Sequence, residues 1–162
     1  MALLKSEIMD DQIVVNGTEA RVYLLFPDGR RKIWANLTKF NVQIDYSKTQ
    51  YPVLGMRTKP SRKGAGTITG SLTQHYNCSE FREAALEYQN SGVDSSYDVQ
   101  IVNEDPNSGV GRQSVILYGL NFDSIPLAML DPESEYLTED LSFTANSFDI
   151  ENSFSSGGLK DA

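Results

Sequence analysis

Residues 36–46 read NLTKFNVQIDY, and this stretch decides the fold class. From Thr38 to Tyr46, every second side chain belongs to a mostly apolar set, whereas the side chains between them are mostly polar. Because successive side chains of a β-strand point to opposite faces of the sheet, this alternation predicts a strand with one buried and one solvated face. Such strands are typical of antiparallel sheets.

The same period of two continues on both sides of this stretch. Turn signals such as Pro27-Asp28-Gly29 and Asp131-Pro132-Glu133 separate the further strands that it predicts, at 19–26, 30–34, 64–77, 97–102, 113–124 and 136–148. Residues 79–90 instead repeat apolar side chains at helical spacing, between a candidate N-cap at Ser79 and a stop at Ser91-Gly92. We therefore predict a mainly β protein, a β-sandwich or open barrel, with one helix after the fourth strand.

Residues 47–63 break the alternation between two of these strands. They contain prolines, a glycine and a cluster of cations, Arg57, Lys59, Arg62 and Lys63. A connection of this length is uncommon inside a compact domain, so we expect a long loop or hairpin arm that is either functional or flexible.

The chain has 162 residues and a formal net charge of −8, from 22 acidic and 14 basic side chains. This length fits one domain, which we expect at 13–152, between an N-terminal extension at 1–12 and a flexible Ser/Gly-rich tail at 153–162. The negative charge argues against tight nucleic-acid binding by a basic patch. We expect no signal peptide and no membrane span, and the single cysteine favours assembly in a reducing cytoplasm.

The motifs of common enzymes and cofactor sites are missing. The spacing of Cys78 and the single histidine, His75, does not by itself build a catalytic pair. A phosphate loop requires a helix after it, and none follows Gly64-Ala65-Gly66, so we interpret this stretch as a glycine pair at the entry to a strand that gives room for a turn. In the acidic pairs Asp10-Asp11 and Glu139-Asp140, neighbours on a strand face opposite ways, so each is interpreted as solvated surface. We predict no catalytic, cofactor-binding or metal-binding residues, and no enzyme.

The polar faces of the long predicted strands carry neutral hydroxyl and amide side chains rather than the usual Lys and Glu. A few aspartates interrupt them. Such a face suits the wall of a wet channel, because passing DNA meets few fixed cations that bind phosphate; a Ser/Thr-rich exposed sheet without a special role is the alternative. The candidate wall residues are Asn41, Gln43, Asp45, Thr67, Thr69, Ser71, Thr73, Asn121, Asp123, Asp140, Ser142, Thr144 and Asn146.

Five stretches, in order and spacing, resemble the PBSX-like tail tube family, the tube proteins of contractile tails in phages and defective prophages of Gram-positive hosts. The resemblance covers residues 14–154 and rests on order rather than on any chemically unique motif; 1–12, the Ser/Gly tail and 47–63 depart from it. The stretches are 13–24 (IVVNGTEARVYL), 63–72 (KGAGTITGSL), 96–102 (SYDVQIV), 119–128 (GLNFDSIPLA) and the turn and strand at 133–148.

The resemblance implies a structural virion protein with a tail-tube fold. It implies hexameric rings whose long strands form a barrel around a lumen, and rings that stack into a tube. Its partners would be other copies, a contractile sheath, baseplate and terminator proteins, and DNA passing non-specifically through the lumen. The helix would lie outside, with Glu80, Arg82, Glu83 and Glu87 either meeting the sheath or solvated. The arm would contact neighbouring subunits or rings through Tyr51, Arg57, Lys59, Arg62 and Lys63.

Other functions also fit the pattern. The tube of an R-type bacteriocin, of another contractile injection device or of a non-contractile tail would share this architecture. A monomeric β-barrel that binds a sugar or another ligand belongs to a different class and predicts an aromatic site, for which Trp34, Tyr46, Tyr51 and Tyr76 are available.

Overall fold

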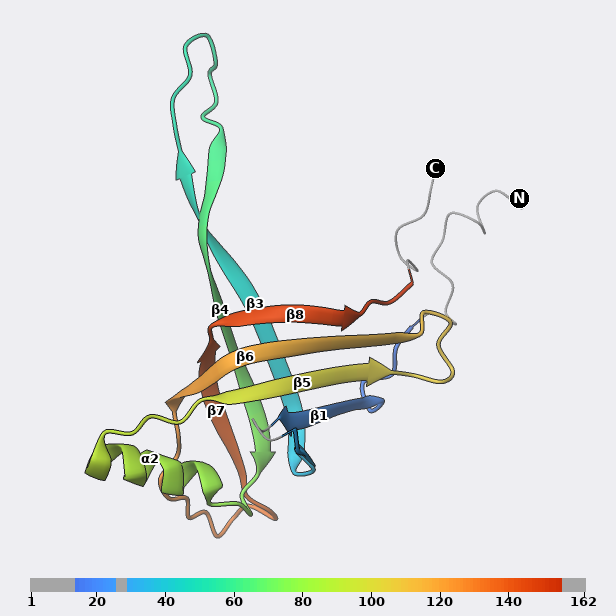
Figure 1. Ribbon diagram of the computed structural model, residues 1–162, viewed down its shortest axis with the longest axis vertical. Helices are drawn as coiled ribbons and strands as arrows, with labels where there is room; N and C mark the ends of the chain where they lie inside the picture. Colours follow the sequence, from blue (N-terminus) through green and yellow to red (C-terminus); the bar gives the residue numbers. More distant parts are fainter. Residues whose placement is uncertain (1–13, 26–28, 156–162) are drawn as a thin grey trace. The chain divides into compact units, whose positions relative to one another are not determined.

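The computed structural model describes residues 14–25 and 29–155. Its elements follow one another as β1 (Ala20–Leu25), β2 (Arg31–Ile33), β3 (Leu37–Gln50), β4 (Ser61–His75), α2 (Glu80–Ser91), β5 (Tyr97–Glu104), β6 (Arg112–Ser124), β7 (Thr138–Ala145) and β8 (Ser147–Asn152) (Figure 1). The strand pairs whose register is resolved are antiparallel. The expected mainly β fold is confirmed, with a helix directly after the fourth strand. The expected segments 1–12 and most of 153–162, like Pro27 and Asp28, lie outside the described residues.

The chain divides into two compact units, each assembled from separate segments. The first unit holds the described residues up to Ala35, residues 97–118 and those from Phe148 on. There β1 lies between β2 and β5, β5 is followed by β6, and β8 also pairs with β6. Val22 and Leu24 from β1 and Val99 and Val102 from β5 are buried. Asp105, which is also buried, accepts a hydrogen bond from the backbone N–H of Asn16 at 2.9 Å.

The second unit holds residues 36–96 and 119–147, and its strands pair in the order β6-β7-β4-β3. Its core is built from one face of these strands, with Leu72 of β4 and Leu141 and Phe143 of β7 almost fully buried. The Phe143 ring stacks on Phe40 with 5.2 Å between centroids. Gly70 makes this possible, because a Cβ at that position would lie 2.5 Å from the Phe143 ring.

Helix α2 packs on the sheet of the second unit through its first turn. Phe81 is buried against Phe122 with 4.6 Å between ring centroids. The helix ends at Gly92, whose φ of 74° is a left-handed conformation that glycine adopts without strain. The predicted stop is thus confirmed, whereas Ser79 precedes the helix without a side-chain capping hydrogen bond. Tyr88, one of the apolar side chains at helical spacing in 79–90, is 50% exposed.

The predicted strand at 136–148 is wrong in one respect, because the chain bends at Asn146 and a separate strand, β8, follows. The Asn146 side chain lies over Gly119 of β6, where a Cβ would meet the amide nitrogen at 2.3 Å. Gly119 also has a φ of 67°, so only glycine fits this crossing without strain. After the bend, β8 pairs with β6.

Candidate functional surfaces: the polar sheet face and the basic arm

The candidate wall residues of the second unit share one face of its sheet. Cross-strand partners point to the same side of a sheet, so the register decides which residues share a face. Gln43 pairs with Thr69, Thr69 pairs with Thr144, and Thr144 pairs with Asn121. This row crosses all four strands of the unit.

Parallel rows complete the same face. Asn41, Ser71 and Ser142 form the next row, Asp45 pairs with Thr67, and Thr73 pairs with Asp140. We call this surface, together with Asp123, the polar face. Lys39 belongs to it as well, because it pairs with Thr73. The remaining candidate, Asn146, lies at the bend beyond β7 and against Gly119.

The polar face hydrogen-bonds to itself. The Thr73 hydroxyl donates to Asp140 at 2.6 Å, and the Thr144 hydroxyl donates to Asp123 at 2.9 Å. The Gln43 amide donates to Asp45 at 3.1 Å. Three carboxylates of the face are therefore engaged by side chains of their own chain.

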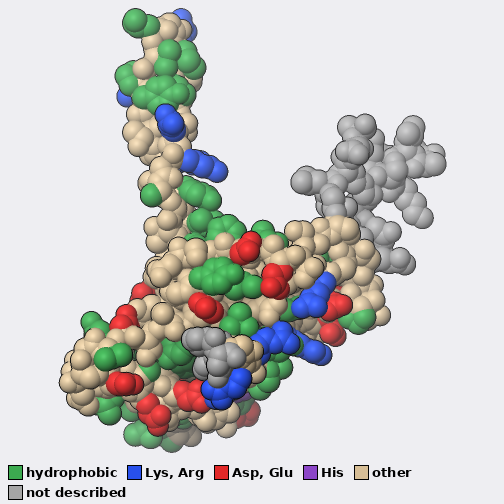
Figure 2. Space-filling view, in the orientation of Figure 1, with side chains coloured by type: hydrophobic (Ala, Val, Ile, Leu, Met, Phe, Trp, Pro, Cys, Tyr) green, Lys and Arg blue, Asp and Glu red, His purple; other side chains and the backbone are tan. Residues whose placement is uncertain are grey.

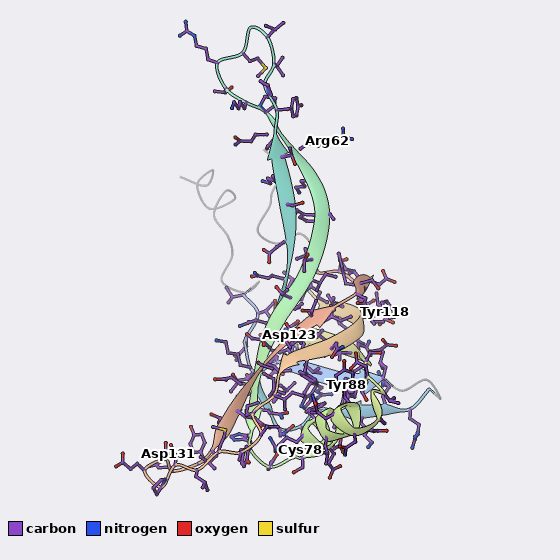
Figure 3. All side chains as sticks on the ribbon, turned by 90° about the vertical axis from the view of Figure 1, so that its left-hand side faces the viewer. Arg62, Cys78, Tyr88, Tyr118, Asp123 and Asp131 are labelled. Atoms are coloured by element: carbon purple, nitrogen blue, oxygen red, sulfur yellow. The ribbon has the colours of Figure 1, made fainter. Side chains whose placement is uncertain are left out.

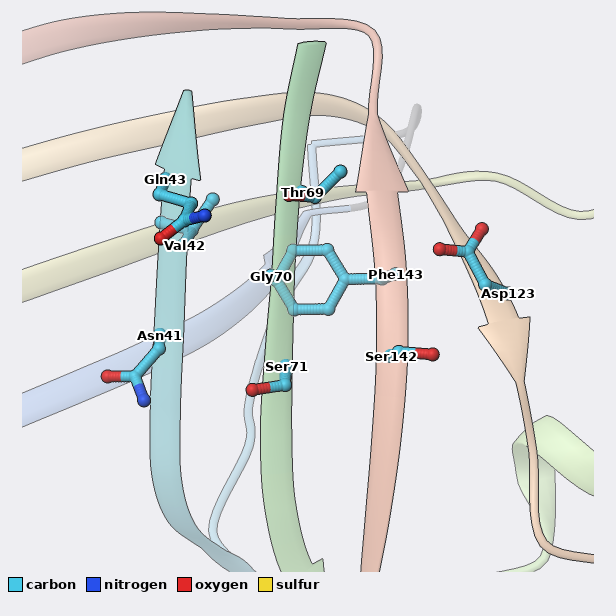
Figure 4. A pocket seen from close by; sticks show the side chains of 9 residues that line it. All are labelled: Asn41, Val42, Gln43, Thr69, Gly70, Ser71, Asp123, Ser142 and Phe143. Carbon is cyan, nitrogen blue, oxygen red and sulfur yellow. The ribbon is translucent and has the colours of Figure 1, made fainter. Parts of the chain in front are cut away.

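A hollow of about 390 Å³ lies on this face. Figure 4 shows it, and its lining contains one charged side chain, Asp123, and no cation. Because the lining has no positively charged side chain, it is not suited to binding a phosphate group. Among the residues that the structure describes, no group of three or more His, Cys, Asp and Glu side chains could hold a metal ion. The lining residues are Asn41, Val42, Gln43, Thr69, Gly70, Ser71, Asp123, Ser142 and Phe143.

We call residues 47–63 the basic arm. Part of this segment is β-strand rather than loop. β3 continues to Gln50 and β4 begins at Ser61, and these two residues pair. The arm is therefore a β-hairpin extension whose loop spans 51–60. Figure 1 shows it as the prolongation of β3 and β4. β4 begins in the arm at Ser61 and first pairs with β7 at Ile68, opposite Ala145, the last residue of β7.

Two glycines shape the base of the basic arm. A Cβ at Gly64 would lie 2.6 Å from the Ser47 hydroxyl, and a Cβ at Gly66 would lie 2.9 Å from the Tyr46 ring. Both lie inside β4, as the predicted strand at 64–77 implies, but no turn adjoins them, because β4 already begins at Ser61. They let side chains of β3 lie across β4, and the Lys63 ammonium sits 4.7 Å from the Tyr46 ring.

The surface of the basic arm combines cations with exposed apolar side chains. Residues 47–63 contain five cations, because Lys48 joins the four predicted ones, and no acid, which gives a net charge of +5. Figure 2 shows the green and blue side chains on the arm. Its exposed apolar side chains are Tyr51, Val53, Leu54 and Met56.

Sequence reasoning missed a buried ionic contact between α2 and the sheet. Glu139 is 2% exposed and not a solvated surface acid, because the Arg82 guanidinium donates to it at 2.5 Å and the Gln74 amide at 2.6 Å. Arg82 also donates to the Cys78 carbonyl and lies over the Tyr76 ring. Arg82 therefore does not belong to the exposed face of the helix, unlike Glu80, Glu83 and Glu87.

Residues that we considered for catalysis or for an aromatic ligand site are buried, half-buried or packed against other side chains. Cys78 is half-buried, and His75 packs edge-on against Tyr136 at 5.8 Å between ring centroids. Trp34 is buried in the first unit. None of the helices in the described part of the chain is long and apolar enough to cross a membrane.

Comparison with known proteins gives consistent results. A family model described as "Phage tail tube protein" matches residues 7–151. The phage-like element PBSX protein XkdM of Bacillus subtilis (strain 168) is 32% identical over 139 residues, which cover 86% of this chain and 91% of that protein.

Two solved structures have similar folds at low identity. A chain in the anti-feeding prophage cap, a tube-terminating cap, has a TM-score of 0.64 at 15% identity, covering 94% of this chain and 100% of that one. A chain in the sheath-tube complex of an extracellular contractile injection system has a TM-score of 0.62 at 11% identity, covering 85% of this chain and 91% of that one.

Proposed function

Because the chain belongs to the phage tail tube family, we propose that it builds the hollow inner tube of a contractile tail as hexameric rings that stack on one another. The family points to a structural role without catalysis. Each copy contributes the polar face of its second unit to the lumen, and DNA passes through this lumen into the host when the tail contracts. The tube assembles in the host cytoplasm and becomes part of the virion.

The composition of the polar face carries the proposal. Its long rows are neutral, its one cation is Lys39, and its acids are Asp45, Asp123 and Asp140. DNA is held by proteins chiefly through cations that neutralise phosphates. A face with this composition lets DNA slide, because it provides little attraction for phosphate.

The edge of the sheet supports ring formation. β3 ends the pairing order of the described strands and spans 14 residues. A long edge strand presents backbone N–H and C=O groups that pair readily with another strand. A neighbouring copy at this edge satisfies them, and a closed ring leaves none exposed.

The outer surfaces provide the contacts to other tail proteins. The basic arm extends beyond β7 and reaches a copy in the adjacent ring, while α2 faces the sheath on the outside of the tube. Baseplate and terminator proteins bind the two ends of the tube. Contacts through the cations of the basic arm make stacking sensitive to salt.

Electron microscopy combined with cysteine labelling tests the proposal. The purified protein is imaged in negative stain across concentration and salt, and we expect six-fold rings or hollow tubes of uniform width. Ser71→Cys, in a Cys78→Ser background, then places a thiol on the polar face, and Glu104→Cys places one at an exposed position of the first unit. In intact tubes, a small maleimide should label both thiols, whereas a maleimide coupled to a large protein should label only the control at Glu104.

A monomer under every condition would refute the tube and favour a ligand-binding β-barrel. Labelling of Ser71→Cys by the large reagent in intact tubes would refute the position of the polar face in the lumen. Nuclease-protected DNA inside complete particles distinguishes a phage tube from the tube of a bacteriocin or another injection device, which assembles in the same way without a genome.

A further inference from the structure

The end of the second unit that carries α2 exposes several large apolar side chains. Leu127, Leu130 and Tyr136 are 76%, 96% and 68% exposed, and Leu86 of the helix is 62% exposed. We call residues 80–93 and 125–137 the acidic end. Their two segments are in contact, because the Arg82 guanidinium donates to the carbonyl of Pro126 at 3.4 Å.

Exposed carboxylates accompany these apolar side chains. Arg82 is the one cation in the two segments, and it is paired with the buried Glu139. The acidic end therefore combines exposed apolar groups with an uncompensated negative charge, which suits a partner that is both apolar and cationic. Its exposed carboxylates are Glu80, Glu83, Glu87, Asp131, Glu133 and Glu135.

The basic arm of the same chain has this chemistry. Its apolar tip and its net charge of +5 without any acid are the counterpart of the acidic end. Within one copy the two surfaces cannot meet. β4 spans 15 residues from Ser61 in the basic arm to His75 beside α2, which corresponds to roughly 50 Å at the usual rise per residue.

The strand topology places the two surfaces at opposite ends of the same strands. His75, at the end of β4, pairs with Thr138, which directly follows the 125–137 segment. Figure 3 shows Arg62 on the arm at one end of the long hairpin and Asp131 and Cys78 near the other end. Copies that stack in one orientation along this direction therefore bring the basic arm of one copy towards the acidic end of the next.

We propose that the acidic end is the docking surface for the basic arm of a second copy in the adjacent ring. This inference rests on the proposed stacking of rings and adds the acceptor to it. Exposed apolar side chains of the arm tip pack on Leu127, Leu130 and their neighbours, and the cations face the surrounding carboxylates.

Charge reversal tests this pairing. Arg57→Glu/Lys59→Glu reverses two cations of the arm, Glu83→Lys/Glu87→Lys reverses two carboxylates of the acidic end, and a fourfold variant combines both. We expect each double variant to raise the protein concentration needed for stacking by about tenfold, because several surface ion pairs are replaced by repulsion. The fourfold variant should recover most of the loss, since it restores opposite charges.

Mixing gives an independent readout. The two double variants, each poor at stacking alone, should form tubes together, because the arm of each then faces an acceptor of opposite charge. Glu19→Lys/Glu104→Lys is the matched control, since it makes the same charge change on exposed residues of the first unit. Circular dichroism checks that each variant is folded, and sedimentation and negative stain measure rings and tubes.

The outcomes separate this inference from the proposed function. If Glu83→Lys/Glu87→Lys stacks like the unmodified protein, or loses only binding of the sheath, the acceptor is wrong while the tube stands. If neither the fourfold variant nor the mixture recovers stacking, the arm and the acidic end do not face each other, and the inference is overturned. If the unmodified protein forms neither rings nor tubes, the proposed function itself fails.

Discussion

Replacing Arg82 by methionine tests how α2 is fixed to the sheet. The side chain of Glu139 is 1% exposed and that of Arg82 is 16% exposed. Arg82→Met keeps an aliphatic chain of similar length but removes the guanidinium. The Glu139 carboxylate then remains buried, with the Gln74 amide as its hydrogen-bond donor at 2.6 Å.

The expected cost follows from this burial. Removing one partner of a buried ion pair lowers the free energy of unfolding by about 3–5 kcal/mol, because the other charge stays buried without compensation. Since Arg82 is partly exposed, water reaches the vacated site and we expect the low end, about 3 kcal/mol. That is a change of about 100-fold in the folding equilibrium.

Urea denaturation followed by circular dichroism measures the effect. It is performed on the arm variant Arg57→Glu/Lys59→Glu, so that stacking does not contribute. The free energy of unfolding of small proteins falls by about 1–3 kcal/mol per molar urea, so a loss of about 3 kcal/mol lowers the urea concentration at the midpoint of unfolding by about 1 M or more. Arg82→Met/Glu139→Leu, which removes both charges, should recover most of the loss. Arg112→Met, at an exposed arginine of β6, is the control and should change the midpoint little.

A loss below about 1 kcal/mol for Arg82→Met would refute the reasoning, because it would mean that the Glu139 carboxylate is stabilised without the guanidinium. A double variant as unstable as Arg82→Met would equally refute it, since the loss would then come from packing rather than from the unpaired charge.

Two further predictions concern backbone fit and titration. Gly70→Ala should lower the free energy of unfolding by about 1–3 kcal/mol in the same denaturation assay, because its Cβ would lie 2.3 Å from the Asn41 carbonyl oxygen and 2.5 Å from the Phe143 ring. Ser134→Ala should raise the pKa of Asp131 in an NMR titration, because the hydrogen bond from the Ser134 hydroxyl is the largest cause of its lowered pKa. This contribution to stability exists above the ordinary pKa of the carboxyl group and is lost as the pH falls through the lowered value.

Each of these two predictions has a control or an outcome that would contradict it. Gly17→Ala places its Cβ where no atom lies within 4 Å, so it should be tolerated. Equal stability of the Gly70 and Gly17 variants would contradict the close packing at β4. An unchanged titration of Asp131 in Ser134→Ala would mean that the backbone N–H groups of Glu133, which donates at 3.1 Å, and of Ser134 maintain the low pKa without the hydroxyl.

The strands of the second unit could be predicted because each has one buried face. In β7, Leu141 and Phe143 are buried, whereas the alternate residues Asp140, Ser142 and Thr144 reach solvent. The pattern therefore predicted which side chains share the polar face. The same alternation contained the signal for Glu139, which falls on the buried set, but an acid there indicates a partner without naming it. Arg82 could not be identified as that partner, because the helical pattern separates polar from apolar residues but does not show which polar residue contacts the sheet.

Two elements could not be placed from a buried face. In β8, Phe148 and Ile150 alternate with Asp149 and Glu151, but every residue is exposed, and the separate strand and its pairing with β6 depend on the bend at Asn146. The strand extensions in the basic arm are likewise exposed on both faces, and the prolines between them and the cations of the arm are typical of a loop. The proposed rings and the proposed contacts with sheath and DNA involve other copies and other molecules, which the pattern of one chain does not specify.

The separation of charge along β4 has a consequence for how a tube begins and ends. Copies that dock arm to acidic end form a polar filament, and its two terminal rings are chemically different. One terminus presents unoccupied cationic hairpins, and the other presents unoccupied carboxylates beside apolar side chains. A protein that nucleates growth at one terminus then needs a surface charge opposite to that of the protein that stops growth at the other, and this difference distinguishes the two directions of elongation.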